Sequence, residues 1–176
     1  FLPIAERLKL TADLDLKAVE LGLQDLARTP ALPGLAINLS ASSLDDRSFI
    51  PKLIALVRQS AGAADRLWLE VAEEGAFKHL EAFRALCPQL KLHGCHVGLE
   101  HFGHRFSQIG QLHDLGLDYL KVDSSFVRGV DANAGNAAFL KGLCGIAHNI
   151  GLVVLAEGVS TDAEISALKS LGFDGA

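Results

Sequence analysis

Five short apolar runs, each ending in polar residues, recur along this chain of 176 residues and constrain its fold more than any other feature. They are LAINLS (35–40), LWLEVAEE (67–74), HVGLEHFG (96–103), YLKVDSSF (119–126) and LVVLAEGV (152–159). The runs are rich in β-branched residues and do not alternate cleanly between apolar and polar. That pattern is typical of strands buried on both faces of a sheet.

Segments with helical periodicity separate these runs. SFIPKLIALVRQSA (48–61) is predicted to be a helix, and NAAFLKGLCGIAHNIG is expected to bury Phe139, Leu143 and Ile146 on one face. TDAEISALKSLG begins with Thr161 three residues before Glu164, which is the spacing of a capping box, and ends at Gly172. The segment LDLKAVELGLQDLA, before the first run, is predicted to be another amphipathic helix.

Strands that alternate with helices predict a parallel sheet with right-handed crossovers. The polar strand ends fall at Asn38, Glu70, Glu100, Asp123 and Glu157, between 23 and 34 residues apart. A (β/α)8 barrel of about 250 residues has roughly 31 residues per unit, so this spacing favours an α/β fold of barrel type. An open, doubly wound sheet is the alternative, but its Gly-rich first turn, G-x-G-x-x-G, does not occur in the sequence.

Composition narrows the possible functions. The net charge is −5 and no run of Lys or Arg occurs, so a binding groove for a nucleic-acid polymer is not expected. The three cysteines are widely spaced without a C-x-x-C motif, which favours a reducing compartment over a disulfide framework. No apolar run approaches the ~18 residues of a membrane-spanning helix.

The strand ends carry the chemistry. In a barrel, the C-terminal ends of all strands meet at one mouth. Carboxylates and an amide there suit a hard cation such as magnesium or manganese, and Lys121 beside Asp123 suits a phosphate. His93, His96, His101 and His104 cluster around one strand, but they lack the H-x-x-x-H spacing of a histidine metal site.

The same residues resemble the motifs of the EAL domain, the family of cyclic di-GMP phosphodiesterases. INLSASSL resembles the family's N-x-S segment, LEVAEE its E-x-T-E segment and LEHFGHRFSQIGQL its D-D-F-G-x-G-Y-S-S-L loop. LKVDSSFV is similar to K-[IV]-D-x-S-F-V, and LAEGVST to A-E-G-V-E-T. The five motifs occur in the family's order across the whole chain.

This resemblance implies a TIM-like (β/α)8 barrel. Residues 1–176 are then expected to be a partial EAL domain of five to six βα units, with the upstream E-A-L strand and the downstream Q-G strand outside the chain. Asn38 and Glu70 match metal ligands of active members, and Glu73 matches the anchor of the loop after the D-D motif. Lys121 matches a lysine near the attacked phosphate, with Asp123 beside it, and Glu157 matches the proposed general base.

Departures from the motifs predict that this domain is not an enzyme and has no catalytic residues. The D-D pair, which holds two metal ions in active members, is Glu100-His101 here, and the second Glu of E-G-V-E-T is Ser160. The motifs' loop glycine is Arg105. Two-metal hydrolysis depends on closely held ligand geometry, which these replacements disturb. Ser160 and Thr161 are explained instead as residues at a helix N-terminus.

The resemblance therefore implies a degenerate receptor that binds cyclic di-GMP and needs no cofactor or metal; magnesium or manganese would matter only for residual activity. The predicted nucleotide-binding residues are Asn38, Glu70, Glu100, Lys121, Asp123 and Glu157. The loop or interface residues are Glu73, Arg105 and Phe106. We expect a homodimer with neighbouring signalling domains, in the cytoplasmic part of a bacterial inner-membrane protein that meets the membrane only through other domains. A weak metal-dependent phosphodiesterase and a nucleotide-free interaction scaffold are the alternatives.

Overall fold

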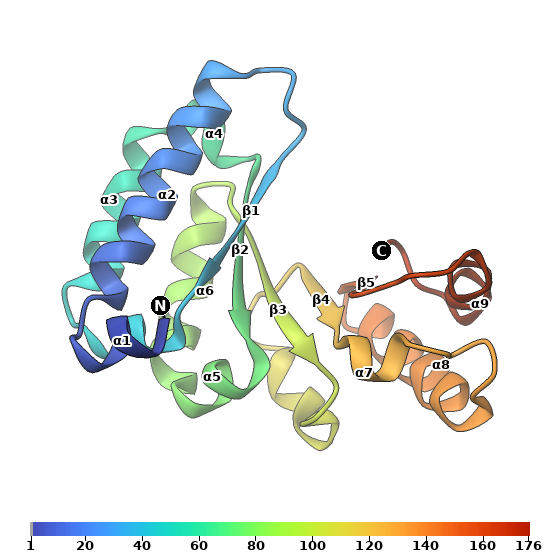
Figure 1. Cartoon of the computed structure of the whole chain (residues 1–176). Helices are drawn as coiled ribbons and strands as arrows, with labels where there is room; N and C mark the ends of the chain where they lie inside the picture. The colour runs from blue at the N-terminus through green and yellow to red at the C-terminus, as the bar shows by residue number, and fades with distance from the viewer. Residues whose placement is uncertain (1) are drawn as a thin grey trace. The chain divides into compact units, whose positions relative to one another are not determined.

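The structure, a computed structural model, describes residues 2–176, so Phe1, where the predicted domain begins, lies outside it. It has five parallel strands with helices between them (Figure 1). The chain divides into two compact units. The first runs to Val97 and includes Asp114–Gly116, and the second contains Gly98–His113 and Leu117–Ala176.

The first unit holds two paired strands and the helices around them. Its elements are α1 (Leu2–Arg7), α2 (Thr11–Arg28), β1 (Leu35–Leu39), the 3₁₀ helix η1 (Ala41–Asp45), α3 (Phe49–Gln59), α4 (Ala61–Ala64), β2 (Leu67–Ala72), α5 (Glu73–Lys78), α6 (Leu80–Leu92) and the start of β3 (His96–Phe102). Strands β1 and β2 pair in parallel, with Asn38 opposite Glu70. Helix α2 packs against β1 and against α3, and Leu26, Phe49 and Leu69 are fully buried in this unit.

A buried carboxylate fixes the chain where β1 ends. Asp15 of α2 is 7% exposed and accepts hydrogen bonds from the Ser40 N–H and the Ser43 hydroxyl, both at 2.7 Å. Burial raises the pKa of Asp15, although these hydrogen bonds oppose the rise. The segment after Asn38 is therefore held against α2 by side-chain contacts as well as by the sheet.

The second unit contains the rest of β3, the 3₁₀ helix η2 (Phe106–Leu112), β4 (Tyr119–Val122), α7 (Ser124–Val127), α8 (Ala134–Asn149), β5 (Val153–Ala156) and α9 (Asp162–Leu171). Strand β4 pairs in parallel with β3 on one side and with β5 on the other. Helix α8 packs against β5 and α9, and Phe102, Tyr119 and Val154 are fully buried.

The strand predictions are confirmed, although the strands end earlier than the apolar runs suggested. Asp123 follows β4 and caps α7, and Glu157 follows the last residue of β5. The buried face of α8 was partly mispredicted: Leu140, Leu143, Cys144 and Ala147 are buried, whereas Ile146 is 41% exposed. Within residues 2–176, no helix combines the length and apolar character needed to cross a membrane.

Candidate functional site

The site in the second unit begins with an irregularity in β3. Gly98 and Leu99 pair in register with β4, but the next paired residue of β3 is Phe102, so Glu100 and His101 interrupt the ladder. A bulge of this kind turns side chains away from the regular alternation of a strand. His101 has a φ of 53°, in the left-handed region that non-glycine residues seldom adopt.

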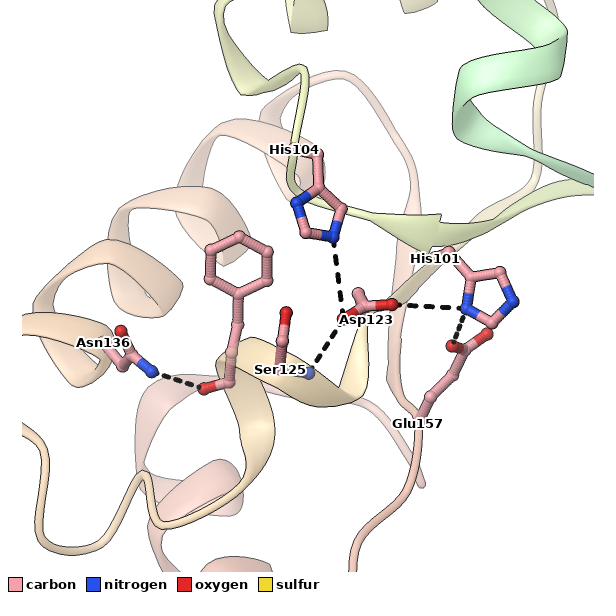
Figure 2. A network of polar contacts seen from close by, with 7 residues as sticks. His101, His104, Asp123, Ser125, Asn136 and Glu157 are labelled. Atoms are coloured by element: carbon pink, nitrogen blue, oxygen red, sulfur yellow. Dashed lines mark hydrogen bonds and ion pairs between the residues drawn. The ribbon is translucent and has the colours of Figure 1, made fainter.

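The bulge places the His101 ring beside two carboxylates from other segments (Figure 2). His101 Nδ1 lies 2.8 Å from Glu157 Oε2 and 3.3 Å from Asp123 Oδ2. The side chains of Asp123 and Glu157 are only 18% and 19% exposed, whereas that of His101 is 57% exposed. The exposed imidazole of His101 thus contacts two carboxylates that are mostly buried.

Asp123 is fixed by the helix that it caps. Its Oδ1 accepts a hydrogen bond of 2.8 Å from the Ser125 N–H, and His104 Nε2 lies 3.7 Å from the same oxygen (Figure 2). Partial burial opposes ionisation, but the hydrogen bonds from Ser125 and the neighbouring His104 and His101 together lower the pKa of Asp123. Asp123 is therefore held as a carboxylate.

Glu157 has the opposite shift. Its backbone N–H donates to the carbonyl of Val122, which ties the end of β5 to β4. Burial raises the pKa of Glu157, although His101 and, more weakly, Lys121 oppose the rise. The charge of Lys121 is thus close enough to favour the Glu157 carboxylate.

The loop after β3 is packed onto the helices of the same unit. The ring of His104 lies 5.2 Å from that of Phe126, which lies 5.1 Å from Phe139. Phe106, half-buried in η2, meets Phe139 edge-to-face at 5.1 Å, while Arg105 is exposed. A loop or interface role for Phe106 and Arg105 stays a prediction.

The predicted residues of the first unit lie at the ends of β1 and β2. Asn38 is exposed, whereas Glu70 and Glu73 are each only 2% exposed, with Glu73 beginning α5. Nucleotide contacts by Asn38, Glu70 and Glu100, and a loop contact by Glu73, stay predictions.

Ser160 and Thr161 lie at the start of a helix, as predicted. Thr161 caps α9 in a capping box with Glu164, and Ser160 donates to the Glu164 carboxylate.

The cluster of His101, Asp123 and Glu157 offers one nitrogen and two carboxylate oxygens, all within 4.8 Å of one another. These are donor types that divalent ions accept, so the residues fit a metal ion as well as an internal hydrogen-bond network. Sequence reasoning identified Asp123 and Glu157 but not the position of His101 between them. Nothing in the pattern HVGLEHFG signals a bulge.

The family model of the EAL domain matches residues 1–176, and the chain belongs to this family. Cyclic di-GMP phosphodiesterase PdeF of Escherichia coli (strain K12) is 29% identical over 177 residues, which cover 99% of this chain and 24% of PdeF. The chain spans about a quarter of the length of the curated relatives that it matches.

Solved structures confirm the expected fold. The phosphodiesterase MucR, in a complex with cyclic di-GMP, matches with a TM-score of 0.89 and 25% identity, over 98% of this chain and 77% of that one. The cyclic di-GMP-bound S helix-GGDEF-EAL structure of Vibrio cholerae LapD matches with a TM-score of 0.90 and 22% identity, over 98% of this chain and 42% of that one.

Proposed function

We propose that this domain binds cyclic di-GMP as a receptor and does not hydrolyse it efficiently. The observation that carries the proposal is the position of His101, whose Nδ1 contacts both Asp123 and Glu157. Nucleotide binding is supported by the cyclic di-GMP complex of MucR, which is 25% identical to this chain.

Loss of hydrolysis follows from what two-metal catalysis needs. Two ions that clamp an attacked phosphodiester are held by shared acidic ligands at fixed positions. In this chain, Glu100 is longer by one methylene than an aspartate, and His101 brings a nitrogen instead of a second carboxylate. Nucleotide binding needs fewer precisely placed groups than hydrolysis, because the cationic Lys121 can attract a phosphate without metal ions at fixed positions.

A relay to other parts of the protein completes the proposal. Nucleotide bound beside Asp123 would alter the loop from Glu100 to Gln108, because His104 touches both Asp123 and the aromatic ring of Phe126. The relay would act on a second subunit or on neighbouring signalling domains. The length of the curated relatives, about four times that of the aligned region, supports the presence of such neighbouring domains. A cytoplasmic position in an inner-membrane protein is part of the same proposal.

Calorimetric titration of cyclic di-GMP into the full-length protein with magnesium present, followed by chromatography of the nucleotide, tests this function. Saturable 1:1 heat with intact nucleotide is expected. Continuing heat and accumulation of linear dinucleotide would contradict the proposed loss of hydrolysis. No heat at all would contradict nucleotide binding and leave an interaction scaffold.

A metal-dependent phosphodiesterase is the second candidate, and one observation favours it: the donor atoms of His101, Asp123 and Glu157 are close enough to hold an ion. Release of linear dinucleotide that depends on manganese and disappears in a Glu157→Gln variant would establish this candidate in place of the receptor.

A further inference from the structure

The geometry points to a binding site for a single nitrogen-preferring divalent ion, of which Zn²⁺ is the example, formed by His101, Asp123 and Glu157; we infer that this site selects such an ion over Mg²⁺. The inference concerns the nucleotide-free protein. It therefore holds or fails independently of cyclic di-GMP binding and hydrolysis.

The distance between His101 Nδ1 and Asp123 Oδ2 suits a small ion. For ligands about 2.1 Å from the ion, tetrahedral coordination separates two donor atoms by about 3.4 Å. Nδ1 of His101 lies 3.3 Å from Asp123 Oδ2, which is close to that separation, and 2.8 Å from Glu157 Oε2. Opening the shorter contact requires only a small rotation of the exposed imidazole.

The ligands are also held in place by their own backbone. Asp123 uses Oδ1 to accept the Ser125 N–H and directs Oδ2 at His101. Glu157 is fixed by its N–H bond to the Val122 carbonyl, and the bulge in β3 sets the position of His101. Preorganised ligands of this kind reduce the cost of binding an ion.

The nitrogen ligand decides which ion is favoured. Mg²⁺ prefers oxygen ligands, keeps several waters and loses them reluctantly. Imidazole suits Zn²⁺ and its neighbours, and three protein ligands with one open position are a common arrangement for zinc. Nδ1 of His101 can bind an ion only when the ring proton is on Nε2, so the ion would replace the hydrogen bond between Nδ1 and Glu157. An uncharged donor and two carboxylates would balance the charge of one divalent ion.

The test measures binding of Zn²⁺ and Mg²⁺ separately, by calorimetry on chelator-treated full-length protein without nucleotide. We expect one Zn²⁺ per chain, bound about a hundredfold more tightly than Mg²⁺, because imidazole suits Zn²⁺ whereas carboxylate and water ligands suit Mg²⁺. His101→Ala should weaken Zn²⁺ binding at least tenfold. His113→Ala, which removes another exposed histidine of the same unit, should leave it unchanged.

Circular dichroism of each variant distinguishes loss of a ligand from loss of the fold. Zn²⁺ affinity that changes less than twofold in His101→Ala, or Mg²⁺ that binds as tightly as Zn²⁺, would overturn the inference. The cluster would then be an internal network in which the imidazole alone neutralises the two acids. Titration of cyclic di-GMP in the presence of chelator reports separately on the receptor function.

Discussion

At the scale of single residues, position matters more than residue type in this site. His101 would be an unremarkable exposed histidine if β3 were regular. Its left-handed φ of 53° and the break in the β3–β4 ladder instead place it within 3.3 Å of both Asp123 and Glu157. A non-glycine residue in that region is strained, and such strain is often found at functional sites.

Lys121 supplies the positive charge in the proposed nucleotide site, so its removal is the first prediction. Lys121→Ala should weaken cyclic di-GMP binding about tenfold or more, because a hydrogen bond to a charged group contributes about 1.5–3 kcal/mol. Lys141→Ala, which removes an exposed lysine of α8, is the matched control. Calorimetry at two salt concentrations measures the effect, and equal affinities for the two variants would remove Lys121 from the site.

Gly98 leads to a prediction about packing. A Cβ at this position would lie 2.6 Å from Tyr119 Cδ2 and even closer to two other ring carbons, and Tyr119 is fully buried. Gly98→Ala should therefore lower the free energy of unfolding by about 1–3 kcal/mol, as overpacking does.

Gly142→Ala is the control for that substitution. Gly142 lies on the exposed face of α8, and a Cβ there would meet no neighbouring atom within 4 Å, so alanine should stabilise the protein by about 0.5–1 kcal/mol. Urea denaturation of the two variants measures both effects, and two changes of the same sign would contradict the packing argument.

At the scale of elements, the start of α9 shows how one carboxylate can join two segments. Glu164 is 4% exposed, and its Oε1 accepts the Gly129 N–H from the segment before α8. Its Oε2 accepts from the N–H and hydroxyl of Ser160 and from the Thr161 N–H. The hydrogen bonds from Gly129 and Ser160 lower the pKa of Glu164 to about 2.

This lowered pKa predicts how stability depends on pH. A carboxylate whose pKa falls on folding stabilises the protein fully above its unfolded pKa, and this contribution is lost as the pH falls through the folded value. The difference in stability between the wild type and Glu164→Gln should thus be constant above about pH 5 and shrink between about pH 4.5 and pH 2. Chemical denaturation across this range measures it.

Asp162→Asn is the control for Glu164. It removes an exposed charge from the same helix turn without touching the buried hydrogen bonds, so stability at pH 7 should change by less than about 0.5 kcal/mol. A difference between the wild type and Glu164→Gln that does not depend on pH would show that the charge of Glu164 contributes nothing to the folded state.

Elements could be predicted from sequence where a local pattern decides them. The capping box follows from Thr161 and Glu164 three residues apart, and it is present in the structure. The buried face of α8 is harder to predict from sequence, because apolar residues occupy two overlapping stripes along this helix. Packing selected the stripe with Cys144 and Ala147, small residues that allow close approach, and left Ile146 exposed.

At the scale of the whole molecule, the order and direction of the strands could be predicted, because apolar runs alternating with helices allow few other arrangements. The centre of the candidate site could not. A bulge with a left-handed histidine depends on tertiary contacts, and so does the long-range hydrogen bond that the Ser40 N–H donates to Asp15. Motif matching identified the acids, whereas the histidine that joins them required coordinates.

Restoring aspartates to the altered motif is the last prediction, and it requires the full-length protein. Glu100→Asp combined with His101→Asp should raise metal-dependent release of linear dinucleotide above the wild-type level, because the second carboxylate that two ions need is returned. Aspartate tolerates the left-handed conformation at position 101. Chromatography of the nucleotide after incubation with manganese measures the gain, with Glu100→Asp alone as the control.

The structure also predicts which further change would be harmful. Ser160→Glu would bring a second carboxylate to the place where Ser160 donates to Glu164. Adding it to the double variant should therefore destabilise α9 through repulsion between like charges. A double variant that binds the nucleotide but releases no product would show that Glu100 and His101 are not what limits hydrolysis. If the triple variant, with Ser160→Glu added, turned over faster than the double variant but unfolded at a lower denaturant concentration, Ser160 would stabilise α9 at the expense of hydrolysis.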